Sequence, residues 1–373
     1  MTNFLFLEKN LLDENKVKAF KERVSYLNSK IIACNYKNNR FKLFFSKKIN
    51  FTEKKKIRNF CKKLISRIKI INPISNEKII FENKAIVSKK KKIFEYLKKN
   101  KSIKNISPGI FTLRGKFLDY FNKLDIFLLR RAKLKKYEKI YVHNMLPIES
   151  FVNNNYISNF PHHIMFATHV KRDLKFIDQL SCSNNINKIN NAVAKPDLVI
   201  SPTVCYHIFE TLKNSFVKKS KVFDSFSSCS RFESINYSTF ERLKSFSMRE
   251  YVAFGSPKFI KKFLANNIDY FKKAFVKNKI KFKIVTANDA FFSQKGIKKM
   301  SYQSLNELKF EFQFWLPNEK KWLAVGSFNN HLDVLVNKYD IKNNKKTLHS
   351  GCIGWGYERF VYAIISQGKK ISY

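Results

Sequence analysis

The first seventy residues contain three short apolar runs and two longer segments with apolar side chains at every third or fourth position. The short runs have the length and composition of strands, and the longer segments have the spacing of amphipathic helices. The predicted elements are strand 3–8, helix 14–29, strands 31–36 and 41–46, and helix 52–68. This order predicts a small α+β domain of the ferredoxin-like type at residues 1–85.

The remaining chain has a different pattern. Lysine runs flank a short helical segment, which predicts a basic linker at residues 86–106, followed by a larger domain at residues 107–373. That domain is predicted to contain helix 116–135, strands 139–144, 197–200, 222–227, 247–254, 281–286, 307–315, 322–326 and 331–336, and a last helix 357–367. Many strands without regular alternation with helices predict a mostly antiparallel sheet flanked by helices.

Composition excludes a disordered chain, because 44% of the 373 residues are apolar and 15% are aromatic. The net charge is +45, from 73 Lys and Arg against 28 Asp and Glu, but only 12 of the basic residues are Arg. A Lys excess beside abundant Asn, Ile and Phe is typical of codon drift. Drift alone and drift together with a polyanionic partner both remain open, so the charge does not identify the partner.

The compartment is predicted from three observations. Six scattered cysteines form no CxxC pair, the N-terminus lacks the pattern of a signal peptide, and no apolar run is long enough to span a membrane. We therefore expect a cytoplasmic protein without a membrane partner.

The scarce glycines and arginines gather at two places. Three of the nine glycines lie within residues 351–356, and Arg359 follows them. Arg231, Arg242 and Arg249 lie within 19 residues of one another. A guanidinium group binds phosphate or carboxylate through two hydrogen bonds, which favours an anion site. Tight packing of the glycines and surface ion pairs of the arginines are the alternatives.

These segments resemble known sequence motifs. Residues 230–251 resemble motif 2 of the class II aminoacyl-tRNA synthetases, and residues 351–359 resemble motif 3. Residues 309–317 and 324–333 resemble the seryl-type enzymes in particular. A weaker resemblance to motif 1 involves helix 116–135 and the residues after it.

A narrower resemblance points to the amino acid:carrier-protein ligases, which are truncated homologues of the atypical, zinc-dependent seryl-tRNA synthetases. It covers about residues 107–373. The segments that carry it are Pro202-Thr-Val-Cys205, Arg231-Phe-Glu233, Ser247-Met-Arg-Glu250, Ala287-Asn-Asp-Ala-Phe-Phe292 and Ser350-Gly-Cys352. The resemblance implies a class II synthetase-like antiparallel sheet flanked by helices and an ATP-dependent ligase.

For the nucleotide, the resemblance implies five contacts. Arg231 binds the α-phosphate and acts in catalysis, and Glu233 contacts the adenine side. Arg242 binds the outer phosphates, while Phe246 stacks on the adenine. Arg359 binds the γ-phosphate from the other side and also acts in catalysis.

The resemblance also implies metals. Cys205, Glu250 and Cys352 match three Zn²⁺ ligands, which leaves a fourth position for the substrate amino group; the alternative for the cysteines is simple burial. Asn288 and Asp289, with Glu250, are expected to bind the amino acid.

Magnesium is the second implied metal. Glu311 and Ser327 are expected to bind ATP and Mg²⁺. Ala324 departs from the family, because seryl-type enzymes place an acidic Mg²⁺ ligand there. Either Glu311 and Ser327 hold the metal, or activation is slower.

Three functions follow from the resemblance. The first is activation of a small amino acid, glycine or alanine, and its transfer to the phosphopantetheine thiol of an acidic carrier protein. The second is seryl-type aminoacylation of tRNA, which is disfavoured by the short segment between Arg231 and Phe246, the lack of heptad helices and the single helix after residue 356. The third is a non-catalytic binding protein. The resemblance also implies a homodimer.

Overall fold

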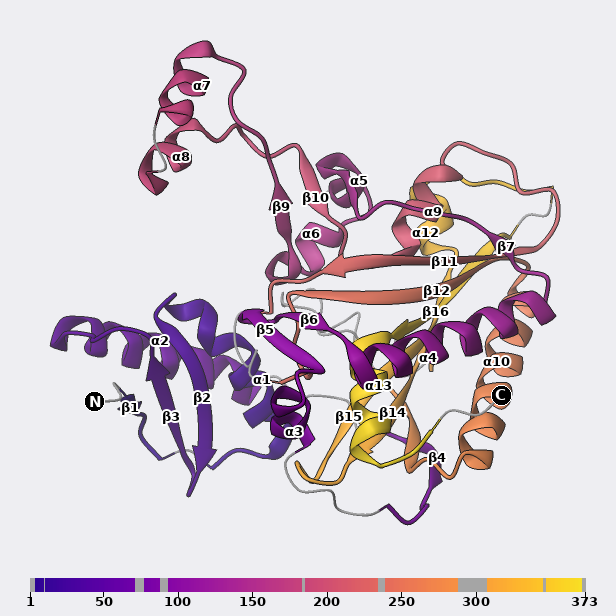
Figure 1. Ribbon diagram of the computed structural model, residues 1–373, viewed down its shortest axis with the longest axis horizontal. Helices are drawn as coiled ribbons and strands as arrows, with labels where there is room; N and C mark the ends of the chain where they lie inside the picture. The colour runs from indigo at the N-terminus through magenta and orange to yellow at the C-terminus, as the bar shows by residue number, and fades with distance from the viewer. Residues whose placement is uncertain are drawn as a thin grey trace.

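The computed structural model describes the chain except residues 1–3, 10, 71–76, 88–92, 183–184, 234–238, 288–306, 345–346 and 371–373. Its N-terminal elements are β1 (Phe4–Phe6), α1 (Glu14–Val24), the 3₁₀ helix η1 (Ser25–Leu27), β2 (Ile31–Lys37), β3 (Arg40–Phe45) and α2 (Phe51–Ile70). Strand β3 lies between β1 and β2 and is antiparallel to both, which is the split β-α-β arrangement of ferredoxin-like folds. Both helices cover one face of this sheet (Figure 1).

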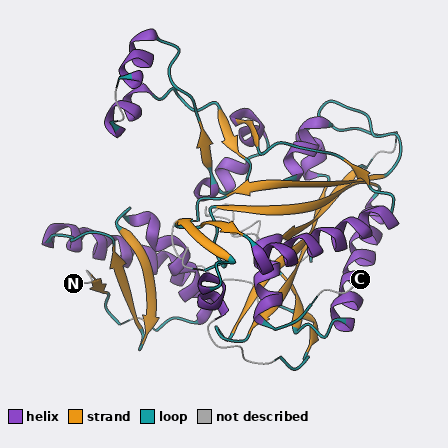
Figure 2. Ribbon diagram, in the orientation of Figure 1, coloured by secondary structure: helices purple, strands orange, loops and turns teal. Residues whose placement is uncertain are grey.

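The body of the molecule is an eight-stranded sheet in the order β4-β13-β14-β15-β16-β12-β11-β7. The strands are β4 (Ile79–Asn83), β7 (Glu138–Lys139), β11 (Lys221–Ser230), β12 (Ser245–Gly255), β13 (Phe282–Thr286), β14 (Lys309–Leu316), β15 (Lys321–Leu332) and β16 (His349–Gly356). All neighbouring strands are antiparallel except β7 and β11. The predicted antiparallel sheet flanked by helices is confirmed (Figure 2).

One face of this sheet is covered by long helices. These are α4 (Gly115–Leu134), α10 (Pro257–Lys277) and α13 (Tyr357–Ser366), and the short α3 (Ile93–Lys99) joins the same core. Trp355 is fully buried there. A Cβ atom on Gly326 would lie 2.4 Å from the Trp355 ring, so only glycine fits at that position. The long helices thus cover one face of the sheet and leave its other face for the site.

The smaller elements lie around this sheet. They are β5 (Ile103–Ser107), β6 (Ile110–Leu113), β8 (Met145–Pro147), α5 (Ile148–Asn153), α6 (Tyr156–Asn159), the 3₁₀ helix η2 (Pro161–His163), β9 (Met165–Ala167), α7 (Leu174–Ser181), α8 (Ile186–Ala192), β10 (Leu198–Ile200), α9 (Cys205–Thr211) and α12 (Val334–Lys338). Strands β5 and β6 pack against the core formed by the long helices. Strands β8, β10 and β9 form a three-stranded sheet, and α7 and α8 project from it away from the body (Figure 1).

The structure corrects two predicted strands. Of the strand predicted at 139–144 only Lys139 is in a strand, because β7, the short edge strand beside β11, covers Glu138–Lys139. The strand predicted at 331–336 does not exist as a unit: β15 continues to Leu332, and α12 then begins at Val334. No described helix is long and apolar enough to cross a membrane.

The structure also differs from the predicted domain boundaries at two elements. Strand β4, inside the predicted first domain, pairs with β13 of the large sheet. Helix α3, inside the predicted linker, places Ile93 and Leu97 in the main core. The first seventy residues keep a hydrophobic core of their own.

Candidate active site

The central strands bring distant residues to one face of the sheet. Gly354 on β16 lies opposite Glu250 on β12 and opposite Ser327 on β15. In the same way Cys352 lies opposite Asn329. Since opposite residues in paired strands point to the same face, these side chains lie together on the face away from α10 and α13. A Cβ atom at position 354 would lie 3.0 Å from Met248 Cε, which is a tight contact, and 3.4 Å from the Glu250 carboxylate.

Cys205, Glu250 and Cys352 form a compact buried cluster. One ligand atom from each lies within 4.8 Å of the others, and no side chain is more than 5% exposed. The backbone N–H of Cys205 donates to Glu250 Oε2 over 2.9 Å. The predicted three-residue set is therefore brought together, although its members are far apart in the sequence.

The protonation of this cluster follows from burial. Burial and the nearby Cys352 raise the pKa of Glu250 to about 7. The hydrogen bond between the two thiol groups, together with burial, raises the pKa of Cys205. The same hydrogen bond, helped by the charge of His331, lowers the pKa of Cys352.

The cluster fits a Zn²⁺ ion. At a Zn–S distance of about 2.3 Å, two sulfur ligands of a tetrahedral ion lie about 3.8 Å apart. The ligand atoms of this cluster all lie within 4.8 Å of one another, so they can accommodate that spacing. Two thiolates and one carboxylate are ligands that Zn²⁺ accepts, and three protein ligands leave a fourth position open. Asn329 Nδ2 donates to Cys352 Sγ over 3.4 Å, and the Thr203 hydroxyl donates to Glu250 Oε1. Such neighbours orient metal ligands.

The sequence interpretation missed the supporting role of Thr203 and Asn329. Both lie in segments that carried the family resemblance, and Thr203 is two residues before Cys205. Their proximity to the ligands depends on the fold, because Asn329 reaches Cys352 only through the pairing of β15 with β16.

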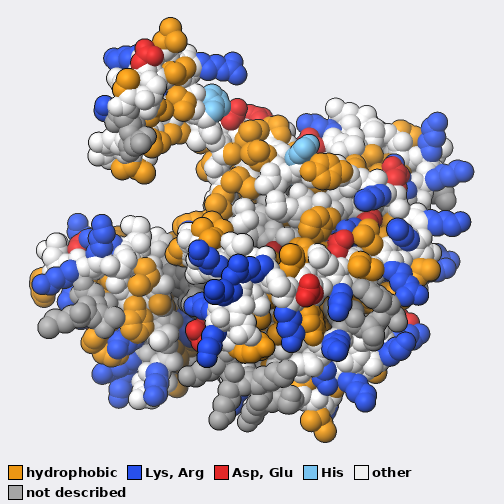
Figure 3. Space-filling view, in the orientation of Figure 1, with side chains coloured by type: hydrophobic (Ala, Val, Ile, Leu, Met, Phe, Trp, Pro, Cys, Tyr) orange, Lys and Arg blue, Asp and Glu red, His pale blue; other side chains and the backbone are white. Residues whose placement is uncertain are grey.

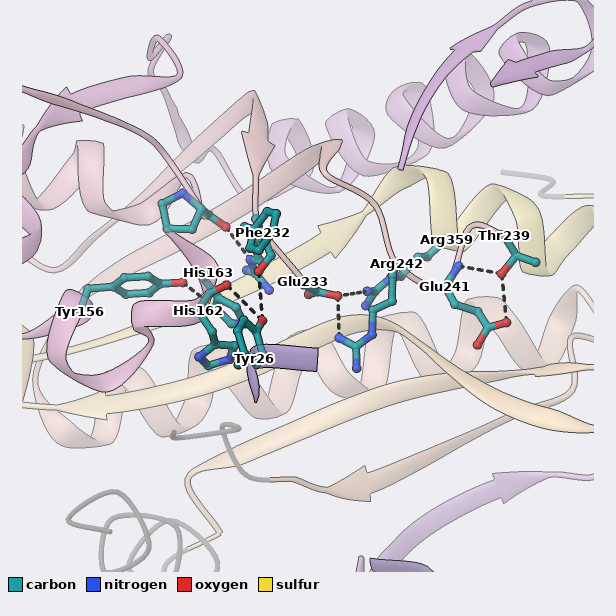
Figure 4. Close-up of polar contacts among 12 residues, drawn as sticks. Tyr26, Tyr156, His162, His163, Phe232, Glu233, Thr239, Glu241, Arg242 and Arg359 are labelled. Carbon is teal, nitrogen blue, oxygen red and sulfur yellow. Dashed lines mark hydrogen bonds and ion pairs between the residues drawn. The ribbon is translucent and has the colours of Figure 1, made fainter. Parts of the chain in front are cut away.

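A second group of residues surrounds Glu233 (Figure 4). Arg242 Nη1 lies 2.6 Å from Glu233 Oε2, and Arg359 Nη2 lies 3.8 Å from the same oxygen. Burial raises the pKa of the Glu233 carboxyl, but the charges of Arg242, Arg359 and Arg231 outweigh it and lower this pKa to about 2. Two guanidinium groups therefore contact one carboxylate, and the charge of a third, Arg231, also acts on it.

Arg231 connects this group to the cysteine cluster. Its Nε donates to the backbone carbonyl of Pro202 over 2.8 Å, and its guanidinium lies 5.4 Å from the centre of the Phe246 ring. The next residue, Thr203, holds Glu250. Neighbouring residues thus bind the arginine on one side and the ligand cluster on the other.

Two histidines beside Arg231 were not predicted. His163 Nδ1 lies 3.1 Å from the Tyr156 hydroxyl, and its backbone carbonyl accepts from the N–H of Phe232. Burial, with the charge of Arg231, lowers the pKa of His163 to about 2, so this ring is neutral. From the N-terminal domain, the Tyr26 hydroxyl lies 3.4 Å from the carbonyls of His162 and Phe232 (Figure 4).

The expected magnesium residues lie side by side. Glu311 on β14 lies opposite Ser327 on β15. Lys309 Nζ is 3.4 Å from Glu311 Oε1, and Asn329 donates to the Ser327 hydroxyl over 3.3 Å. Asn288 and Asp289 lie outside the described residues.

Arg249 is on the opposite face and has a structural role. Its Nη1 donates to both carboxylate oxygens of Asp224 over 2.7 Å, and its Nη2 lies 2.8 Å from Asp125 Oδ1. Arg249 binds carboxylates inside the core, whereas Arg231, Arg242 and Arg359 meet near Glu233.

The chain is similar in sequence to two groups of known ligases. No family model matches the chain. A type-2 serine–tRNA ligase of Methanopyrus kandleri is 23% identical over 269 residues, which are 66% of this chain and 51% of that protein. Amino acid–[acyl-carrier-protein] ligase 1 of Bradyrhizobium diazoefficiens is 30% identical over 176 residues, which are 46% of this chain and 53% of that protein. The chain is a homologue of both groups of ligases. It spans about half the length of these curated relatives.

Solved structures show the fold of this synthetase homologue. The M. kandleri seryl-tRNA synthetase in complex with Aquifex aeolicus tRNASec superposes with a TM-score of 0.70 at 17% identity, over 98% of this chain and 73% of that one. The cytoplasmic serine–tRNA ligase of Naegleria fowleri in complex with AMP gives 0.62 at 13% identity, over 85% and 67%. The predicted class II, seryl-type fold is confirmed.

Proposed function

We propose that this synthetase homologue activates a small amino acid with ATP and transfers it to the phosphopantetheine thiol of a carrier protein. One observation carries the proposal: adjacent residues Pro202 and Thr203 contact Arg231 and Glu250, respectively. An amino acid bound at the Cys205–Glu250–Cys352 cluster would therefore have its carboxylate close to a phosphate bound by Arg231. In-line attack requires this proximity.

In the first step an oxygen of the amino acid carboxylate attacks the α-phosphorus of ATP. The bond from that phosphorus to the bridging oxygen breaks, and pyrophosphate leaves with the electron pair. Arg231 and Arg359 neutralise the charge that grows on the phosphate oxygens, and Arg242 holds the outer phosphates. Phe246 offers an aromatic face to the adenine.

The substrate amino group is the proposed partner of the cysteine cluster. Bound there, Zn²⁺ would supply a Lewis acid that selects a free amine. Cys205, Glu250 and Cys352 would hold the ion, while Thr203 and Asn329 keep the ligands oriented. Glu311 and Ser327 are the proposed Mg²⁺ residues.

In the second step a thiolate of the acceptor attacks the carbonyl carbon of the aminoacyl-adenylate. A thioester forms, and AMP leaves with the electrons of the carbon–oxygen bond. The named relative from Bradyrhizobium supports a carrier-protein thiol as acceptor. The strongly basic chain would also attract an acidic carrier, and complementary charge speeds encounter. Aminoacylation of tRNA is the second candidate, supported by the serine–tRNA ligase relatives.

Pyrophosphate exchange tests the activation step. The purified chain, ATP and Mg²⁺ are incubated with each amino acid, starting with glycine and alanine, and we expect exchange with a small one. Arg231→Ala or Arg359→Ala should lower the exchange rate at least a hundredfold, since each removes charge stabilisation near the reacting phosphate. Arg172→Ala, at an exposed position in the segment leading to α7, is the matched control.

The acceptor is tested with the same preparation on a holo carrier protein and on tRNA in parallel. Product on the carrier protein is expected. Aminoacylated tRNA without carrier product would contradict the acceptor, and no exchange with any amino acid would support the non-catalytic alternative.

Metal analysis tests the zinc site independently of activity. We expect about one Zn²⁺ per chain, and its loss in Cys352→Ala. Cys229→Ala is the control, because this cysteine is equally buried but outside the cluster. Unchanged zinc content in Cys352→Ala would remove the metal from the proposal.

A further inference from the structure

Three phenylalanine rings and one lysine lie on the face of the N-terminal sheet that is turned away from α1 and α2. Phe4 and Phe6 on β1 lie opposite Phe44 and Lys42 on β3, so all four side chains share that face. Leu5 and its neighbours point the other way, into the core. Phe4 is 43% and Phe6 is 48% exposed. We call Phe4, Phe6, Lys42 and Phe44 the aromatic face.

The rings of the aromatic face are arranged around the ammonium group. Lys42 Nζ lies 4.0 Å from the centre of the Phe4 ring and 5.2 Å from the centres of Phe6 and Phe44. The Phe4 and Phe6 rings are 5.2 Å apart and nearly perpendicular, at 74°. Cation–π attraction holds the lysine among the rings, so its charge stays beside two exposed aromatic side chains.

The surroundings of the aromatic face are basic. Strands β1, β2 and β3 contain no acidic residue, and Lys37 and Arg40 are exposed at the turn that joins β2 to β3. Residues 1–70 hold 19 Lys and Arg against five Asp and Glu, a greater excess per residue than in the rest of the chain. Apolar side chains gather on this lobe among Lys and Arg (Figure 3). A polyanion is therefore attracted to it.

We propose that the aromatic face binds single-stranded RNA. Unpaired bases offer flat π-faces that stack on phenylalanine, and the adjacent phosphates are attracted to Lys42 and the nearby basic residues. A duplex buries its base faces within the helix, so it could use only the charge. An acidic protein would likewise use the lysines, but few of its side chains are aromatic, whereas every base of an unpaired strand offers a flat face for stacking.

Binding is tested on the full chain by fluorescence anisotropy with a labelled twelve-nucleotide RNA, in A-rich and U-rich versions. Phe4→Ala/Phe6→Ala should weaken binding at least tenfold, because two stacking contacts are lost. Lys42→Gln should weaken it about threefold and reduce its salt dependence. The matched controls are Phe51→Ala/Phe60→Ala and Lys55→Gln, exposed positions on α2, and they should change binding less than twofold.

Three results would overturn the proposal. One is an equal loss of binding in the controls, which would mean that only net charge attracts RNA. Another is equal or tighter binding of a twelve-base-pair RNA duplex. The third is that the aromatic-face variants lose binding of a holo carrier protein but keep that of RNA. Pyrophosphate exchange should be unchanged in the Phe4→Ala/Phe6→Ala variant, so this test stands apart from the proposed activity.

Discussion

At the scale of single residues, Arg249 shows how one position within a recognisable motif can serve stability. It is 5% exposed, and Asp224, which it contacts through two hydrogen bonds, is 2% exposed. Tyr357 accepts a further bond from Arg249 Nε over 3.0 Å. A buried pair of opposite charges adds little net stability, because both charges lose their hydration. Removing one partner, however, leaves the other charge unpaired in the core.

We therefore predict that Arg249→Met lowers the free energy of unfolding by about 3–5 kcal/mol. Urea denaturation followed by circular dichroism measures this. Asp125→Asn is the milder control, because Asp125 is 31% exposed and water can replace its contact. Arg249→Met/Asp224→Leu should recover most of the loss, and a single variant as stable as the wild type would contradict the assignment.

At the scale of elements, helix α13 is fastened to β12 by Glu358. Both carboxylate oxygens accept from the backbone N–H of Ser247, at 3.0 and 2.9 Å. Burial raises the pKa of Glu358 to about 7, although the bond from Ser247 opposes this shift. The helix that carries Arg359 is thus positioned through a carboxyl group that retains its proton nearly to neutral pH.

The raised pKa of Glu358 predicts the direction in which stability changes with pH. In the unfolded chain Glu358 loses its proton near pH 4.5, whereas in the folded chain it does so near pH 7. Its contribution to stability therefore falls as the pH rises from about 4.5 to about 7 and is level above that. Relative to the wild type, Glu358→Gln should gain about 2–3 kcal/mol between pH 5 and pH 8.

Thermal unfolding of both proteins across this pH range provides the measurement. Glu138 is an exposed carboxyl at the edge of the sheet, so Glu138→Gln should have the same unfolding temperature as the wild type at every pH. A constant difference between the wild type and Glu358→Gln would show that Glu358 is ionised in both states.

The elements also show what the sequence can predict. The N-terminal order and the helix over 116–135 were predicted because their periodicity is local. Helix α10 was missed, although Ser256 caps it by accepting from the N–H of Phe259 and Pro257 occupies its first position. The strand proposed at 139–144 failed because an edge strand ends where its partner no longer pairs, which local composition does not encode.

For the site, the motifs predicted which residues belong to it but not how they are arranged. The Cys205–Glu250–Cys352 cluster depends on the register of β12 with β16, which pairs residues about a hundred positions apart. Strand alternation alone separates Arg249 from Glu250, because successive side chains point to opposite faces. The contacts of Thr203 and Asn329 required the packed structure.

At the scale of the whole molecule, α4 presents an apolar stripe to the outside. Ile126 is 54% and Leu134 is 62% exposed, and Leu129 lies between them. By resemblance this helix belongs to motif 1, through which class II enzymes pair. We predict a homodimer that forms through α4.

Sedimentation velocity tests the dimer. Ile126→Asp/Leu134→Asp should convert it to monomers, because charged side chains would be buried at the interface. The control Leu174→Asp/Ile186→Asp changes residues that are 76% and 69% exposed on α7 and α8. A wild-type monomer, or dissociation in the control alone, would contradict this interface.

The contact of Glu233 with Arg242 and Arg359 has a consequence for how a nucleotide would enter. The Glu233 carboxylate already balances part of the positive charge of Arg242 and Arg359. Nucleotide binding would then be an exchange of one anion for another, and its affinity would reflect only the difference between the two. A small anion gains little by such an exchange, whereas a triphosphate that reaches several guanidinium groups at once gains more. Glu233 would thus compete with incoming anions for the arginines, and it would favour ligands with several phosphate groups over small anions.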